Sequence, residues 1–259
     1  MSTSVSTPAV IRASKLAVGY GQTKVLQNVD ISLASGASLA LVGTNGSGKS
    51  TLLKTLVGLL KPLDGSLERT NVSIAYLGQS HAVNGLLPVQ ARDVVTMARY
   101  SRRGLVSRLT SDDRDAVEAA LERTGVTDLA KRPLRSLSGG QRQRVFLAQV
   151  LASQAAVLVF DEPTAGLDAG STERYLTIVQ EELSRGATVI TATHDIAEAL
   201  RCDQAMLLAG RVVAAGAPHD VLSAERLLDA FGIALHSVPH GGHHDLVVTA
   251  APHAHEHPH

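Results

Sequence analysis

Two glycine-rich turns in this sequence have the composition of phosphate-binding loops. The first, Gly43-Thr44-Asn45-Gly46-Ser47-Gly48-Lys49-Ser50, has the spacing G-x-x-x-x-G-K-[ST] and is followed by Thr51. Its glycines let successive backbone N–H groups turn inward on a phosphate, and the helix expected after it adds the positive end of its dipole. The lysine supplies a charge to the terminal phosphates, and the Ser50 hydroxyl is a ligand for Mg²⁺. Residues 43–51 are therefore predicted to hold a nucleotide.

The second glycine-rich turn is Leu137-Ser138-Gly139-Gly140-Gln141, which also opens a predicted helix. A single mononucleotide site needs only one such cradle. A chain with two cradles and one base is therefore expected to complete its site by lending one cradle to another copy of itself.

Acidic residues and a histidine follow two predicted strands. The apolar run 156–160 ends in Asp161 and Glu162, and His194 follows the β-branched run 188–193. Since α/β folds place ligands at the carboxyl ends of their strands, these side chains are expected at one edge of a sheet. Asp161 is suited to hold Mg²⁺, and Glu162 to polarise the water that attacks a γ-phosphate. An acid pair after a strand is common by itself, but its presence beside a phosphate loop makes it specific.

The elements around these residues predict an α/β fold. It has a parallel-sheet core that resembles that of a P-loop NTPase (RecA-like), an antiparallel β subdomain and an inserted α-helical subdomain. The core is expected over 9–82 and 153–235, the helical subdomain over 83–152, and a His-rich, flexible tail over 236–259. Helices are predicted at 50–60, at 89–100 with Val94, Val95 and Met97 as its apolar side, at 111–123 and at 139–151. Residues 61–65 are predicted to form a turn, and 72–77 a strand.

Composition excludes several classes of protein. Lys plus Arg and Asp plus Glu both number 24, so the basic footprint of a nucleic-acid binder is missing. Cys202 is the only cysteine, which excludes an intrachain disulfide and favours a cytosolic chain with a packed, inert thiol. We expect no signal peptide in 1–13 and no run long enough to span a bilayer, so a separate membrane partner would be needed for any transport role.

From residue 9 to about 232, the motifs resemble in order the ATP-binding cassettes of ABC transporters. Leu137–Gln141 is similar to the family's signature sequence, which closes on ATP held by the phosphate loop of a head-to-tail second subunit. The resemblance implies a homodimeric ATPase that uses ATP and Mg²⁺, with Lys49, Glu162 and His194 as catalytic residues and with Ser50, Gln79 and Asp161 as the residues that hold Mg²⁺.

Further site residues follow from the same resemblance. Tyr20 resembles the aromatic residue that stacks on adenine, Gln79 the glutamine that senses the partner subunit, Asp168 the D-loop aspartate, and His194 the histidine that touches the γ-phosphate. Simpler interpretations remain: Tyr20 as a half-buried strand residue, Gln79 as a strand cap and His194 as a core histidine.

The transported substrate is predicted less directly. Residues 91–105 resemble the ATPases of bacterial zinc and manganese importers, whose permease contacts a surface that here spans about 81–104. Iron-chelate importers have similar helices, and Thr164 stands where metal importers often have phenylalanine. The resemblance implies a peripheral protein on the cytoplasmic side of the membrane, a permease on another chain and, indirectly, an extracytoplasmic metal-binding protein. A soluble ABC ATPase of repair or translation, and a metal scaffold with a vestigial ATPase, are the alternatives.

The C-terminal segment favours a metal. Imidazoles are good ligands for Zn²⁺, Ni²⁺ and Cu²⁺. A flexible tail could wrap several of them around one Zn²⁺, or it could be a passive polar tail. The candidate ligands are His240, His243, His244, His253, His255, His257 and His259.

Overall fold

The computed structural model describes residues 9–79, 89–103, 108–231, 233–240 and 243–250, and for 101–103 and the last two ranges it describes only the backbone. A six-stranded sheet forms the centre, in the order β5-β6-β7-β3-β8-β9. Its first five strands are parallel and the edge strand β9 is antiparallel to β8. Their bounds are β3 Ser38–Gly43, β5 Ile74–Leu77, β6 Val157–Asp161, β7 Thr188–Thr193, β8 Gln204–Leu208 and β9 Val212–Gly216.

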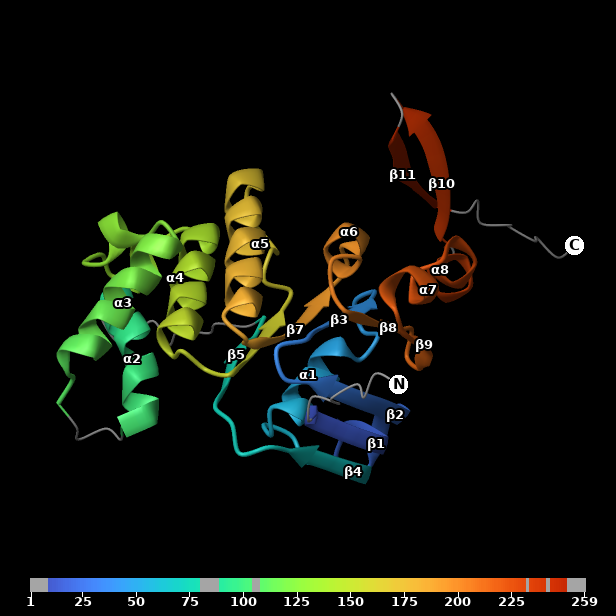
Figure 1. Cartoon of the computed structure of the whole chain (residues 1–259), viewed down its shortest axis with the longest axis horizontal. Coiled ribbons are helices and arrows are strands. Elements are labelled where there is room, and N and C mark those ends of the chain that lie inside the picture. The colour runs from blue at the N-terminus through green and yellow to red at the C-terminus, as the bar shows by residue number, and fades with distance from the viewer. Residues whose placement is uncertain (1–8, 80–88, 104–107, 232, 241–242, 251–259) are drawn as a thin grey trace, which may run out of the picture.

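A second, three-stranded antiparallel sheet has the order β2-β1-β4, with bounds β1 Ala9–Tyr20, β2 Thr23–Ala34 and β4 Asp64–Arg69. Helix α1 (Lys49–Leu56) lies between this sheet and the central one (Figure 1). Its residues Leu52, Leu53 and Leu56 are fully buried in a cluster that includes both sheets. The predicted core with an added antiparallel β sheet is confirmed. The two sheets together hold in place the helix that follows the phosphate loop.

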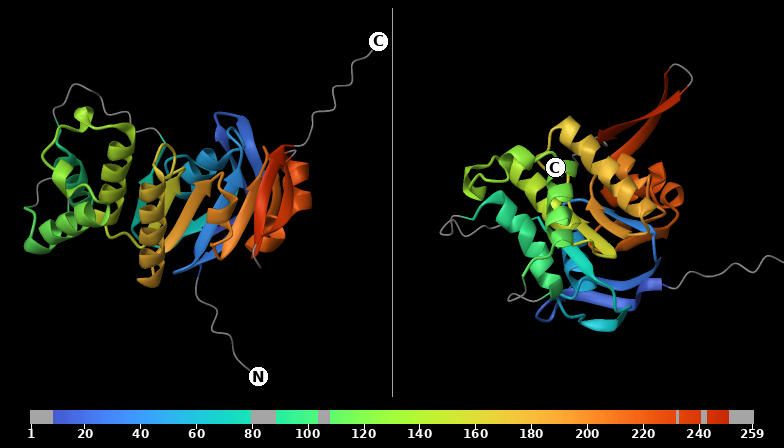
Figure 2. Two further views of the ribbon diagram at one scale, coloured as in Figure 1. Left: turned by 90° about the horizontal axis from the view of Figure 1, so that it is seen from above. Right: turned by 60° about the vertical axis from the view of Figure 1, so that its left-hand side comes forward.

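Helices α2 (Ala91–Arg103), α3 (Ser111–Arg123) and α4 (Gly139–Ala152) form a block at one end of the molecule, and the C-terminal helices lie at the other end (Figure 2). Between the helices of the block run two short 3-10 helices, Thr127–Leu129 and Leu134–Ser136. The apolar cluster of the block continues through Leu158 and Phe160 of β6 to Tyr175 of α5 (Ala169–Ser184). The signature helix α4 is thus packed against the same core as the central sheet.

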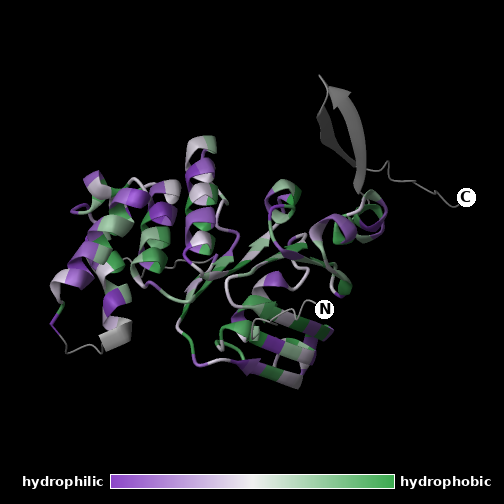
Figure 3. Ribbon diagram, viewed as in Figure 1, coloured by the Kyte–Doolittle hydropathy of each residue, from purple (hydrophilic) through white to green (hydrophobic). Residues whose placement is uncertain are grey.

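The strands of the central sheet alternate between its two faces, as a period of two requires. In β6, Val157 and Val159 join the cluster with α1, whereas Leu158 and Phe160 face α4 and α5. Figure 3 shows the hydrophobic strands enclosed between helices whose outward turns are hydrophilic. The remaining helices are α6 Ile196–Ala199, α7 Pro218–Val221 and α8 Ala224–Phe231.

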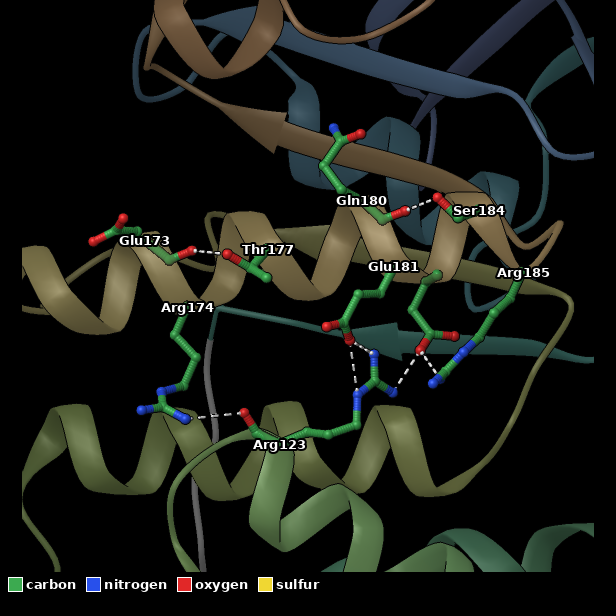
Figure 4. Close-up of polar contacts among 9 residues, drawn as sticks. Arg123, Glu173, Arg174, Thr177, Gln180, Glu181, Ser184 and Arg185 are labelled. Carbon is green, nitrogen blue, oxygen red and sulfur yellow. Dashed lines mark hydrogen bonds and ion pairs between the residues drawn. The ribbon is translucent and has the colours of Figure 1, made fainter.

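Polar contacts also join the helical block to α5. Arg123, the last residue of α3, lies 2.7 Å from a carboxylate oxygen of Glu181 and 2.6 Å from one of Glu182. Its main-chain carbonyl accepts a hydrogen bond from Arg174 at 3.5 Å. Figure 4 shows these side chains bridging the space between α3 and α5.

Four expectations about local structure need correction. Helix α1 ends at Leu56, not at residue 60, because Gly58 adopts a φ of 87° and its N–H bonds to the carbonyl of Thr55, which closes the helix. Residues 64 and 65, predicted as turn, begin β4, an edge strand whose polar composition conceals it. Met97 is 50% exposed, because the buried stripe of α2 runs through Ala91, Val94, Val95 and Ala98.

The fourth correction concerns the C-terminal segment. Where the sequence predicted a flexible tail from 236, the structure forms an antiparallel hairpin of β10 (Ile233–His240) and β11 (His243–Ala250). Gly241-Gly242 between the strands is a hairpin sequence that the histidine-rich composition obscured.

Candidate functional site

The phosphate loop connects β3 to α1, and its backbone needs glycine at two positions. Gly46 and Gly48 have φ values of 81° and 102°, in the left-handed region. A Cβ on Gly48 would also lie 2.7 Å from Leu26 Cγ. Among the described residues no side chain caps α1 at Gly48, so the first-turn N–H groups take no side-chain acceptor. A helix start of this kind favours an anion.

Lys49 directs its ammonium group into the loop. Its side chain is 4% exposed, and Nζ donates to the carbonyls of Gly43 at 2.7 Å and Thr44 at 3.1 Å. Nζ also lies 3.2 Å from Oε1 of Glu162. A lysine and a glutamate predicted from segments more than a hundred residues apart therefore meet at one point.

Glu162 adopts a backbone conformation that is uncommon for a residue with a side chain. Its φ is 52°, and its N–H donates to the carbonyl of Ala192 on β7 at 2.9 Å. Strained backbone of this kind is concentrated at functional sites, where the surrounding fold holds it in place. Here it turns the chain directly after β6, so that Glu162 faces Lys49.

Asp161 lies beneath Glu162 with both of its oxygens hydrogen-bonded. Ser50 Oγ donates to Oδ1 at 3.0 Å, and Tyr76 OH donates to Oδ2 at 3.1 Å. Burial raises the pKa of Asp161 above its ordinary value, with a contribution from the charge of Glu162, although the Ser50 and Tyr76 hydrogen bonds act in the opposite direction. Burial and the Asp161 charge also raise the pKa of Tyr76.

Sequence reasoning missed Tyr76, and only the strand order identifies it. Strand β5 pairs with β6, and Tyr76 stands opposite Val159, two residues before Asp161. The tyrosine ring also explains Gly78, because a Cβ at that position would lie 3.0 Å from Tyr76 Cε1. Any larger residue at position 78 would therefore crowd the Tyr76 ring.

A cleft of about 500 Å³ opens over the phosphate loop. It collects the predicted residues 45–51, Gln79 and Glu162. It adds Val25, Gln143 and Ala165, which the sequence did not suggest. Gln143 is placed there by α4, and its Nε2 donates to the carbonyl of Pro163 at 3.1 Å.

Other predicted residues lie outside the walls of this cleft, although the structure describes them all. Tyr20, at the end of β1, is 51% exposed. His194 is exposed directly after β7, whose last residue Thr193 pairs with Val42 just before the phosphate loop. Asp168 is the N-cap of α5, and the N–H of Ser171 donates to it at 2.7 Å. That hydrogen bond lowers the pKa of Asp168.

The second glycine-rich turn also lies outside the cleft and begins α4. Ser138 caps the helix in a reciprocal pair with Gln141: Ser138 Oγ accepts from the N–H of Gln141 at 3.2 Å, and Gln141 Oε1 accepts from the N–H of Ser138 at 2.9 Å. Ser138 and Gly139 are exposed, and Gly140 packs close to Gly166. One chain alone therefore has one cradle in its cleft and presents the other to solvent.

The side chains that the structure describes do not test the expected zinc ligands. His253, His255, His257 and His259 lie outside the described residues, and His240, His243 and His244 are described by their backbone. Among the side chains that the structure describes, no group of three or more His, Cys, Asp or Glu residues gathers around a common point.

Comparison with known proteins decides the family. The sequence profile described as ABC transporter matches residues 26–165. The chain is 36% identical over 232 residues to "Manganese transport system ATP-binding protein MntB" of Bacillus subtilis, covering 86% of this chain and 92% of that protein. The chain belongs to the ABC transporter family.

Other ABC proteins support the same assignment. "Ferric enterobactin transport ATP-binding protein FepC" of Escherichia coli is 35% identical over 240 residues, covering 87% of this chain and 88% of that protein. A solved structure of "a putative metal-chelate type ABC transporter" in an inward-facing conformation aligns with a TM-score of 0.82 and 27% identity, covering 94% of this chain and 97% of that one.

The family fixes the general activity. This chain is an ABC ATPase with the P-loop NTPase fold, and ABC ATPases use ATP and Mg²⁺. Hydroxyl, carboxylate and amide oxygens from Ser50, Asp161 and Gln79 are the hard donors that Mg²⁺ prefers, so the residues present fit that ion. No helix in the described part of the chain is long and apolar enough to cross a membrane.

Proposed function

We propose that this ATPase powers the uptake of a divalent metal ion, zinc in the first place and manganese in the second, through a permease on a separate chain. The geometry that carries the ATPase role is the meeting of Lys49 and Glu162 above a hydrogen-bonded Asp161. An extracytoplasmic metal-binding protein would supply the ion, and this chain would be peripheral on the cytoplasmic side of the membrane. The importer class is supported by relatives named for manganese and for a ferric chelate.

In this proposal each residue of the cleft has one task. Lys49 and the loop N–H groups neutralise and orient the phosphates. Glu162 accepts a proton from the attacking water, and His194, at the end of the neighbouring strand, contacts the γ-phosphate. Ser50, Asp161 and Gln79 would hold Mg²⁺, which supplies charge neutralisation on the phosphates when bound. Tyr20 would stack on the base.

The roles of Glu162 and Lys49 can be separated by two substitutions. Glu162→Gln keeps the phosphate contacts and removes the base, so we expect ATP affinity to persist, turnover to fall by about 10²–10⁴-fold, and an ATP-bound dimer to accumulate. Lys49→Ala should lose ATP binding itself. Equilibrium nucleotide binding and steady-state hydrolysis measure the two effects, and wild-type turnover in Glu162→Gln would refute the assignment.

The exposed Ser138 end supports a composite site in a head-to-tail dimer, where Ser138–Gln141 and Asp168 of one chain close on ATP in the other. In a mixture of Ser138→Arg and Lys49→Ala chains, each inactive alone, a heterodimer retains one complete site. About a quarter of all sites should then recover, because about half of the dimers are mixed. No recovery on mixing would show that the site is completed within one chain.

The cargo is tested by transport. The surface proposed to receive the permease spans 81–104, and of it 81–88 and 104 lie outside the described residues. Reconstitution with a candidate permease, in vesicles offered zinc, manganese or a ferric chelate, separates the cargoes. ATP-dependent uptake of a ferric chelate alone would replace the divalent-metal proposal with an iron-chelate importer.

We further propose that the His-rich C-terminal segment captures Zn²⁺. Calorimetry of the full chain and of a chain ending at Val238 compares the segment with the rest of the protein. Equal zinc binding by both chains would refute this role.

A further inference from the structure

The residues on either side of His194 are held by a series of hydrogen bonds. Thr193, the last residue of β7, donates from its hydroxyl to Oε2 of Glu198 at 2.8 Å. The same hydroxyl accepts from the N–H of Asp195 at 3.0 Å. Oδ1 of Asp195 in turn accepts from the N–H groups of Ala197 and Glu198, at 2.8 Å and 3.3 Å. The backbone of His194 therefore lies between two residues that are both fixed.

Glu198 is the unusual member of this series, because its carboxyl group is buried. The residue is 7% exposed, and Thr193 is 1% exposed. Burial raises the pKa of Glu198, whereas hydrogen bonds with Thr193 and Tyr175 and the charge of His194 lower it. Since a buried acid is costly unless it is hydrogen-bonded, the presence of this glutamate points to a role other than filling space.

The contact between Glu198 and Thr193 differs from an ordinary helix cap. Asp195 is the N-cap of α6, and Glu198 is the third residue of that helix. In a capping box, the glutamate at this position accepts directly from the N–H of the N-cap residue. Here the Asp195 N–H donates to Thr193 instead, and Glu198 accepts the proton of the Thr193 hydroxyl. Because a threonine hydroxyl rotates, an acceptor for its proton fixes the direction of the lone pair that faces Asp195.

We propose that Glu198 is a positioning residue, which fixes the backbone on both sides of His194 through the Thr193 hydroxyl. Thr193 pairs with Val42, next to the phosphate loop, so these hydrogen bonds begin at the edge of the sheet that carries the cleft. Without the carboxyl group, the Thr193 hydroxyl is free to turn away from the Asp195 N–H, and His194 loses its fixed starting position for contact with the γ-phosphate. This inference rests on the role proposed above for His194.

Steady-state ATP hydrolysis by the full-length chain tests the proposal. Glu198→Ala should lower kcat by about 10–100-fold and leave the KM for ATP within about threefold of wild type, since a small misplacement of a catalytic group can cost about 10²-fold. Glu198→Gln keeps an oxygen that can accept from Thr193, so its kcat should be within about threefold of wild type. Cys202→Ala is the matched control and should hydrolyse ATP like wild type, because Cys202 contacts only the main-chain carbonyl of Glu198 among the hydrogen bonds described here.

A second pair of variants removes the hydroxyl and keeps the carboxyl group, which covers the case in which Glu198→Ala does not fold. Thr193→Val should lose turnover as Glu198→Ala does, whereas Thr193→Ser keeps the hydroxyl and should retain turnover. Urea unfolding of each variant measures its folded fraction under the assay conditions, so that lost turnover is not confused with lost protein.

Combination with His194→Ala separates positioning from general damage to the fold. If Glu198 acts through His194, Glu198→Ala should lower kcat no further in a chain that already carries His194→Ala. The same fall in both backgrounds would overturn the proposal. So would wild-type turnover in Glu198→Ala and Thr193→Val beside an impaired His194→Ala, a result that leaves the proposed function intact. Wild-type turnover in His194→Ala would refute the role of His194 itself, and the positioning role with it.

Discussion

Helices α2 and α3 are joined by two Arg–carboxylate pairs, one buried and one exposed, which allows a comparison of what holds the helical block together. Arg99 Nε and Nη2 both lie 2.8 Å from Oδ1 of Asp113, with side-chain exposures of 7% and 0%. Arg99 also donates to the carbonyl of Ala152 at 2.9 Å. Arg92 forms the second pair, with Glu118, with exposures of 41% and 47%.

We expect Arg99→Met to destabilise the protein by about 3–5 kcal/mol, because it removes one partner of a buried ion pair. Arg92→Met on the same helix should cost about 0–1 kcal/mol, since an exposed pair gains little from its charges. For a chain of this size the first change corresponds to a fall in Tm of roughly 6–20 °C and the second to a few degrees at most.

Urea unfolding followed by circular dichroism, with thermal scans as a second measurement, gives both values. The double variant Arg99→Met/Asp113→Asn should recover part of the loss, because it removes both charges and keeps a side-chain oxygen that can accept the hydrogen bonds from Thr110. Equal effects of Arg99→Met and Arg92→Met would refute the argument that burial decides the contribution of these pairs. A change in the urea m-value would instead show that the helical block unfolds separately.

Three further changes test single groups. Tyr76→Phe removes a hydrogen bond that lowers the pKa of Asp161, so the acid limb of the ATPase pH profile should move to higher pH, whereas an unchanged profile would exclude this coupling. Burial raises the pKa of Glu198. The stabilisation linked to this shift is complete below the pKa of the unfolded state and is lost as the pH rises through the pKa of the folded state. Glu198→Gln should therefore gain stability over wild type with rising pH in urea titrations. Burial raises the pKa of Cys202 to about 12, so thiol reagents should modify it slowly in the folded protein and rapidly in urea.

The fold class could be predicted because its main signals are local in sequence. The phosphate loop, Asp161-Glu162 and His194 each follow a buried strand, and parallel strands bring their carboxyl ends to one edge. Tyr76 could not be found in this way, since its contact with Asp161 depends on β5 being the neighbour of β6. Val25 and Gln143 were missed for the same reason: tertiary packing alone brings them to the cleft.

The hairpin shows a different limit of sequence reasoning. Composition alone gives the histidines of 236–244 equal standing as ligands, and it predicts a flexible tail. Pairing removes that equality, because a shift of one residue in register would move every side chain of a strand to the other face. In the observed register His240 stands opposite His243, whereas His244 stands opposite Pro239. His240 and His243 therefore share one face of the hairpin and His244 lies on the other, a distinction that composition cannot supply.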